Sequence, residues 1–200
     1  MTRTLQHNQT TPRRIFSATR TTVSTFGIMA ALAGIEHGIG EILQGNVAPD
    51  GIVFLSWPDS AFFDIVGGEP AMTLIPNLLV SGILAILFSS IFLLWATLLV
   101  ERKHSALMLM LLSLIILLVG GGFGPPLLGL ILSVTATRIH APLRWWRTRL
   151  SVSLRNFLSR VWPWSFAAAI TAWLLMLPGS SILAYYFAVN DPTLVLTLIL

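Results

Sequence analysis

Residues 22–43 read TVSTFGIMAALAGIEHGIGEIL, an apolar stretch long enough to cross a membrane as one helix. Glycines recur through this stretch and just beyond it, at Gly27, Gly34, Gly38 and Gly45. At about 100° per residue these four positions fall within about 40° of one another, so one side of the helix lacks side chains. We expect this face to pack against a neighbouring helix of the same chain, with self-association of two copies as the alternative.

Charged residues are strongly segregated along the chain. No lysine or arginine lies between Thr21 and Glu101, and no aspartate or glutamate lies between Arg102 and Asn190. The basic clusters flank apolar stretches, whereas the loop at residues 46–76 is acidic and has no base. The positive-inside rule therefore predicts a multi-pass protein of the cell membrane with a cytoplasmic N-terminus, an external loop 46–76 and cytoplasmic residues 138–162.

Composition argues against a soluble globular protein. Hydrophobic residues make up 55% of the chain and charged residues 10%, and the mean hydropathy is +0.82, whereas soluble domains carry about 25% charged residues. The net charge of +4 comes from arginines that flank apolar segments, so we interpret them as contacts to anionic lipid and not to nucleic acid. The lack of cysteine excludes disulfides and thiolate chemistry.

The predicted fold is an all-α polytopic transmembrane bundle, forming one domain at residues 21–200 after a disordered cytoplasmic tail at 1–20. About five membrane segments are expected, at residues 22–43, 77–100, 105–120, 127–137 and 164–189. The third and fourth are too short for two full crossings, which predicts a helical hairpin broken by glycine and proline. The turn residues expected to line a pocket are Gly120, Gly121, Gly122, Gly124, Pro125 and Pro126.

Residues 143–162 have apolar side chains on one side and arginines on the other, which is typical of an amphipathic helix lying at the membrane interface. We expect it to bind anionic lipids on the cytoplasmic face. The arginines assigned to lipid headgroups are Arg144, Arg147, Arg149, Arg155 and Arg160.

Three ionisable residues lie inside the first apolar stretch: Glu36, His37 and Glu41. A charged carboxylate at the centre of a membrane helix costs about 2.5–3.5 kcal/mol, so such residues are expected to serve a function. His37 and Glu41 are four residues apart and can share a proton or an ion. We interpret the three residues as an ion or proton site, with a solvated Glu41 and a merely hydrogen-bonded His37 as the alternative.

A metal site would need a further ligand, because no other histidine falls in a predicted span. One of the acidic residues of the external loop, Asp50, Asp59, Asp64 or Glu69, would have to fold down to supply it. The sequence alone therefore predicts neither a metal nor a cofactor.

The leading functional hypothesis is a small proton- or cation-coupled transporter with an outward-facing Glu/His site. One alternative is a membrane-embedded enzyme that acts on a lipid or lipid-linked substrate. Another is a non-catalytic scaffold or subunit, working as a homo-oligomer or in a membrane complex. The sequence contains no nucleophile motif such as GxSxG or HExxH, which favours a role other than catalysis.

Overall fold

The computed structural model describes residues 17–141 and 144–187, without the side chains of Trp145 and Arg147. The predicted tail lies outside this range up to residue 16, and so do residues 188–189 of the last predicted span. The described chain is mostly helical, as predicted. Three helical stretches in it are long and apolar enough to cross a membrane: α1 (Ala18–Gln44), α2 (Leu78–Thr97) and residues Val152–Phe187.

The predicted total of about five membrane segments is not confirmed. Residues 105–137 form two short apolar helices, α3 (Ser105–Leu118) and α4 (Gly124–Ala136), of 14 and 13 residues. A helix needs about 20 residues to cross the hydrocarbon layer alone. The turn between α3 and α4 falls at the predicted glycine and proline residues, and a hairpin embedded in the membrane stays a prediction.

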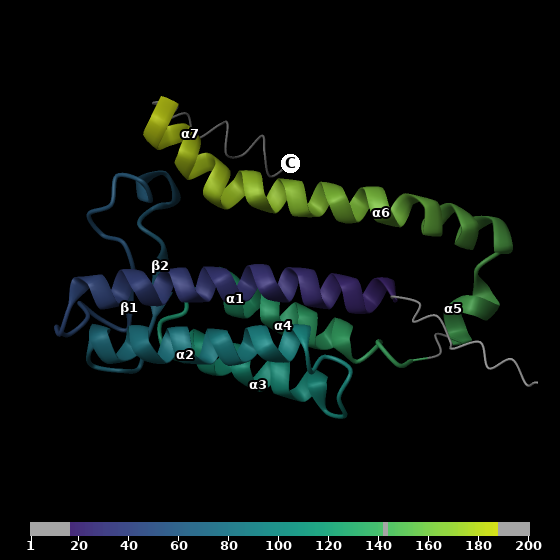
Figure 1. Cartoon of the computed structure of the whole chain (residues 1–200), viewed down its shortest axis with the longest axis horizontal. Helices are drawn as coiled ribbons and strands as arrows, with labels where there is room; N and C mark the ends of the chain where they lie inside the picture. Colours follow the sequence, from purple (N-terminus) through teal and green to yellow (C-terminus); the bar gives the residue numbers. More distant parts are fainter. Residues whose placement is uncertain (1–16, 142–143, 188–200) are drawn as a thin grey trace, which may run out of the picture.

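Helices α1 to α4 pack side by side as a bundle in which α1 contacts α2 and α4, and α3 contacts the same two helices (Figure 1). α1 begins at Ala18, within the segment expected to be a disordered tail. Two contacts stabilise this start: the Ser17 hydroxyl accepts a hydrogen bond from the Arg20 backbone N–H, and Arg20 Nε lies 3.2 Å from Glu101 Oε1. The helix therefore begins about four residues earlier than predicted.

The glycine stripe of α1 lies against small residues of α2. A Cβ atom on Gly27 would lie 2.6 Å from Ala96 Cβ, and one on Gly38 would lie 2.7 Å from the Gly82 carbonyl oxygen. Gly34 lies equally close to Ser89. The stripe is therefore occupied within the chain and is not available to a second copy. Gly45 differs, since it ends α1 with φ +92° and has open space around it.

The loop between α1 and α2 contains a two-stranded antiparallel sheet that the all-α prediction missed. Strand β1 (Val53–Leu55) pairs with β2 (Pro70–Met72), and a 3₁₀ turn, η1 (Asp64–Val66), lies between them. The α3–α4 turn joins the other edge of β2, because the Gly120 N–H donates to the Met72 carbonyl at 2.9 Å. These bonds fix the turn relative to the loop.

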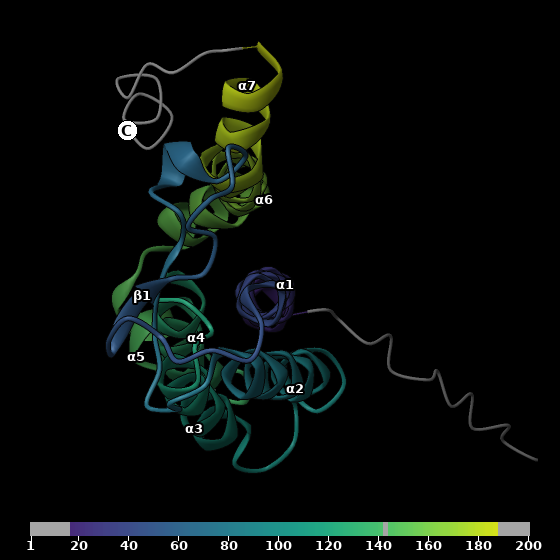
Figure 2. The ribbon, with the colours of Figure 1, turned by 90° about the vertical axis from the view of Figure 1, so that its left-hand side faces the viewer.

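The C-terminal part is a long arm on the side of α1 opposite to α2 (Figure 2). It consists of α6 (Val152–Leu174), the π-helical turn η2 (Leu175–Gly179) and α7 (Ser180–Phe187), and the short helix α5 (Arg144–Arg149) precedes it in the chain. The single interfacial helix expected at 143–162 is instead interrupted, because Ser151 caps a new helix through the Leu154 N–H. This helix continues through Pro163 into the last predicted span.

The arm exceeds the thickness of a membrane. Its 36 residues from Val152 to Phe187 would extend about 54 Å as a helix, against about 30 Å of hydrocarbon. Its first turns, with Arg155 and Arg160, would therefore project beyond the apolar layer. Among the described residues two aromatic contacts connect the arm to the rest of the chain, Phe26 with Phe166 at a ring separation of 5.9 Å and Phe62 with Tyr185 at 6.0 Å.

The two ends of the bundle differ in charge. At one end, called here the basic end, α1 begins and α4 finishes, and it carries Arg20, Arg102, Lys103 and Arg138. The other end, called here the acidic end, carries the loop 45–77 and the α3–α4 turn. The charge segregation of the sequence is thus a separation in space.

Candidate functional site

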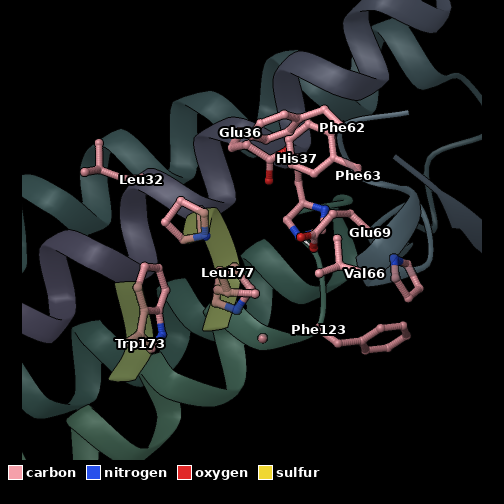
Figure 3. A pocket seen from close by; sticks show the side chains of 15 residues that line it. Leu32, Glu36, His37, Phe62, Phe63, Val66, Glu69, Phe123, Trp173 and Leu177 are labelled. Atoms are coloured by element: carbon pink, nitrogen blue, oxygen red, sulfur yellow. Dashed lines mark ion pairs between the residues drawn. The ribbon is translucent and has the colours of Figure 1, made fainter. Parts of the chain in front are cut away.

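His37 is held at both ring nitrogens by the loop of the acidic end. Its side chain comes from α1 and is buried, with the residue only 2% exposed. Nδ1 lies 2.9 Å from the Ser56 hydroxyl. Nε2 lies 3.3 Å from Glu69 Oε2, which is the ion pair seen in Figure 3. The orientation of the ring is therefore fixed from two sides.

The sheet explains how two residues thirteen positions apart reach the same imidazole. The Ser56 N–H donates to the Glu69 carbonyl at 3.0 Å, and the Trp57 N–H donates to the Gly68 carbonyl at 3.0 Å, so the pairing of β1 and β2 continues past both strands. Glu69 has φ +56°, an uncommon value for a residue with a side chain. Such strain is found where the surroundings fix a side chain for a function.

Glu36 completes a cluster of three ionisable groups. One carboxylate oxygen of Glu36, one of Glu69 and a ring nitrogen of His37 all lie within 4.8 Å of one another. Glu36 Oε1 is buried and has no hydrogen-bond partner among the described residues. Buried polar oxygens are normally paired, so this one calls for a ligand, a proton or a water molecule.

The cluster forms part of the wall of a cavity of about 480 Å³ (Figure 3). α1, the loop, the start of α4 and the arm all contribute to this wall. Most lining side chains are apolar, and among the described residues the lining includes no lysine or arginine. The main apolar residues of the lining are Leu32, Phe62, Phe63, Val66, Phe123, Trp173, Leu177 and Pro178.

Glu41, the third predicted member of the site, does not line this cavity. It is fully buried against Gly120, where a Cβ atom would overlap its carboxyl group. Both of its oxygens lack a hydrogen bond among the described residues. Ser81 is close by, but its hydroxyl lies 2.7 Å from the Thr73 hydroxyl and 2.9 Å from the Val119 carbonyl. Glu41 thus lies outside the cavity lining and outside the cluster that Glu36 and His37 form with Glu69.

The residues of the predicted pocket-lining turn divide into two groups. Gly124 and Pro125 line the cavity. The others pack inside the protein: Gly120 against Glu41, Gly122 against the His37 ring, Gly121 against Ile116, and Pro126 in the core.

The start of α4 offers few donors to an anion. Two of its first four residues are prolines without an N–H, Pro125 and Pro126, and the Leu127 N–H donates to the Phe123 carbonyl. The carboxylates of Glu36 and Glu69 therefore dominate the electrostatics of the cavity. The arrangement suits a cation.

The arginines assigned to lipid headgroups lie far from this cluster. Arg144, Arg149, Arg155 and Arg160 are exposed on α5 and the first part of α6. The side chain of Arg147 lies outside the described part of the chain. Their contact with anionic lipid stays a prediction.

Ser56 was not anticipated from the sequence, because a single serine in a loop carries no distinguishing pattern.

Comparison with protein-family models, with curated proteins and with solved structures gave no match to this chain. The function is therefore inferred from the geometry of the site itself.

Proposed function

We propose that this chain is a small proton- or cation-coupled membrane transporter whose ion site combines Glu36 and His37 of α1 with Glu69 of the loop. One observation carries the proposal: three ionisable side chains from two separate elements converge within 4.8 Å beside a cavity of about 480 Å³. Maintaining such groups in an apolar layer is costly, and intramembrane ionisable residues commonly mark ion pathways.

The proposed orientation puts the basic end in the cytoplasm and the acidic end outside. Arg102 and Lys103 between α2 and α3, and Arg138 after α4, support this assignment through the positive-inside rule. The ion site would then face the outer side of the cell membrane. The arginines of α5 and early α6 would contact anionic lipid on the cytoplasmic side.

Ion flux through the purified protein tests the proposal. The full chain is reconstituted in liposomes that contain a pH-sensitive or a metal-sensitive dye, and a gradient of protons, sodium or divalent metal is imposed. Wild type is expected to carry one of these ions faster than protein-free liposomes. Glu36→Gln removes a carboxylate charge at the site with little change in shape, and is expected to abolish the flux.

The matched control is Asp59→Asn, which removes one charge from an exposed residue of the loop that also carries Glu69. It is expected to transport like wild type. Equal flux in wild type and Glu36→Gln, or no flux of any tested ion in wild type, would contradict the proposal.

A second candidate function follows from the apolar cavity wall. Phe62, Phe63 and Trp173 would suit the hydrocarbon part of a lipid, so an enzyme that acts on a lipid or lipid-linked substrate is the alternative, with His37 as general base. Incubation of the protein with labelled lipid extract distinguishes the two. Conversion of a lipid by wild type but not by His37→Gln, without ion flux, would favour the enzyme.

A further inference from the structure

We infer that His37 Nε2 and the carboxylates of Glu36 and Glu69 form a binding site for one divalent transition-metal ion of the zinc class. The inference deepens the proposed function and rests on it for the transport role of the site, since it names the chemical class of the cation. The binding site itself rests on the geometry of the described residues.

The donor set selects the class of metal. Calcium and magnesium prefer sites made entirely of oxygen, whereas an imidazole nitrogen suits zinc, iron, cobalt and nickel. The chain has no cysteine to favour copper(I). Zinc and non-haem iron sites with open positions combine imidazole and carboxylate ligands, and one imidazole with two carboxylates belongs to this mixed class.

The distances are close to those of a metal site. Donors bound at about 2.0 Å to a tetrahedral ion lie about 3.3 Å apart. His37 Nε2 and Glu69 Oε2 already have this separation, at 3.3 Å. One Glu36 oxygen lies within 4.8 Å of both, and Oε1 of this carboxylate has no hydrogen-bond partner among the described residues. A rotation of its flexible side chain that shortens the Glu36–His37 and Glu36–Glu69 separations by at most about 1.5 Å each would complete the triangle of donors.

Ser56 provides the support that a metal-binding histidine requires. A histidine that binds a metal through one ring nitrogen normally donates a hydrogen bond from the other, which fixes its tautomer. Ser56 Oγ lies 2.9 Å from Nδ1 and can accept that bond. Nε2 is then unprotonated and faces the two carboxylates. Ser56 is therefore a positioning residue, while Glu36, His37 and Glu69 are the ligands.

Charge also favours a divalent ion. Two carboxylates and a neutral imidazole carry a net charge of about −2 when ionised, and the described cavity lining supplies no lysine or arginine to offset it. A divalent cation neutralises this charge. The adjoining cavity leaves room for water or another ligand at the open coordination positions.

Metal binding by the full chain tests the inference. Purified protein without an affinity tag, in lipid nanodiscs, is titrated with Co²⁺, whose visible absorption reports coordination, and then with Zn²⁺ as competitor. We expect one ion per chain. Glu36→Gln and Glu69→Gln should each weaken binding about ten-fold or more, and Ser56→Ala should weaken it about 10- to 100-fold without removing a ligand. Asp59→Asn should bind like wild type.

Loss of a ligand must be separated from loss of the fold. Each variant is therefore compared with wild type in thermal unfolding without metal. Glu36→Gln is the decisive variant, because Glu36 Oε1 gives up no hydrogen bond in the described structure. Zn²⁺ should raise the unfolding temperature of wild type and not that of folded Glu36→Gln.

Two outcomes would overturn the inference: no stoichiometric Co²⁺ or Zn²⁺ binding by wild type at micromolar metal, or equal binding by wild type and folded Glu36→Gln. The second would assign the metal to surface histidines or aspartates. Metal binding without ion flux in liposomes would support the metal site and contradict the transporter function. Proton flux without metal binding would do the reverse.

Discussion

Alanine at Gly122 should destabilise the protein more than alanine at Gly67, although the backbone is similar at the two positions. Gly122 has φ +75° and Gly67 has φ +70°. Both are in the left-handed region, which costs a residue with a Cβ about 1–2 kcal/mol. Their surroundings differ, because a Cβ on Gly122 would overlap the His37 ring, whereas one on Gly67 would have nothing within 4 Å.

The difference between the two variants isolates the contact with His37. Overpacking in a buried site costs a further 1–3 kcal/mol or so. Gly67→Ala should therefore lose about 1–2 kcal/mol of stability, and Gly122→Ala about 2–5 kcal/mol. For a chain of this size each kcal/mol corresponds to about 2–4 °C in the unfolding temperature.

The two variants are compared by thermal unfolding in the same detergent and by Co²⁺ titration. Gly122→Ala should melt about 2–12 °C below Gly67→Ala, and it should also lose metal affinity because His37 must move. Gly67→Ala should keep the affinity of wild type. Equal melting temperatures would mean that the α3–α4 turn does not lie against His37, and would refute the packing on which the site depends.

The remaining predictions concern packing, topology and surface charge. Gly38→Leu should lower the unfolding temperature in detergent, since its Cβ would lie 2.7 Å from the Gly82 carbonyl. Leu43→Ile, at a residue that is 70% exposed, should leave the unfolding temperature unchanged. Similar unfolding temperatures for the two variants would mean that the glycine stripe faces lipid. Because the chain has no cysteine, Asp59→Cys should react with an impermeant maleimide in intact cells and Thr148→Cys only after lysis; external labelling at residue 148 would overturn the proposed orientation. Glu101→Gln should change stability by only about 0–1 kcal/mol, because its carboxylate is half exposed beside Arg20, and a larger loss would show a buried role for the pair.

The sequence predicted the long helices because their signal is local. The apolar stretches at 22–43 and 77–100 correspond to α1 and α2, and the glycine spacing of α1 indicated the face that meets α2. The break within the predicted interfacial helix 143–162 was harder to predict. The break depends on a single cap by Ser151, and hydrophobic periodicity does not distinguish that break from a continuous helix.

The candidate site could be predicted only in part. Glu36 and His37 stand out because ionisable residues are rare in a membrane helix. Glu69 appeared only as one of four acidic loop residues, because its position depends on strand pairing. Two three-residue strands give no clear sequence pattern, and β2 begins with a proline. The two glycines before Glu69 mark a turn but do not show where it leads.

The sequence paired Glu41 with His37 because residues four apart on a helix lie on one face, and in the structure Glu41 does not line the cavity beside Glu36 and His37. Four residues of α1 rise about 6 Å, so His37 and Glu41 lie about one turn apart along the helix. The turn after α3 matches this spacing, since Gly122 lies against His37 and Gly120 against Glu41. Both contacts require glycine, because a side chain at either position would meet the ring or the carboxyl group. The turn therefore covers Glu41 while Glu36 remains beside the cavity.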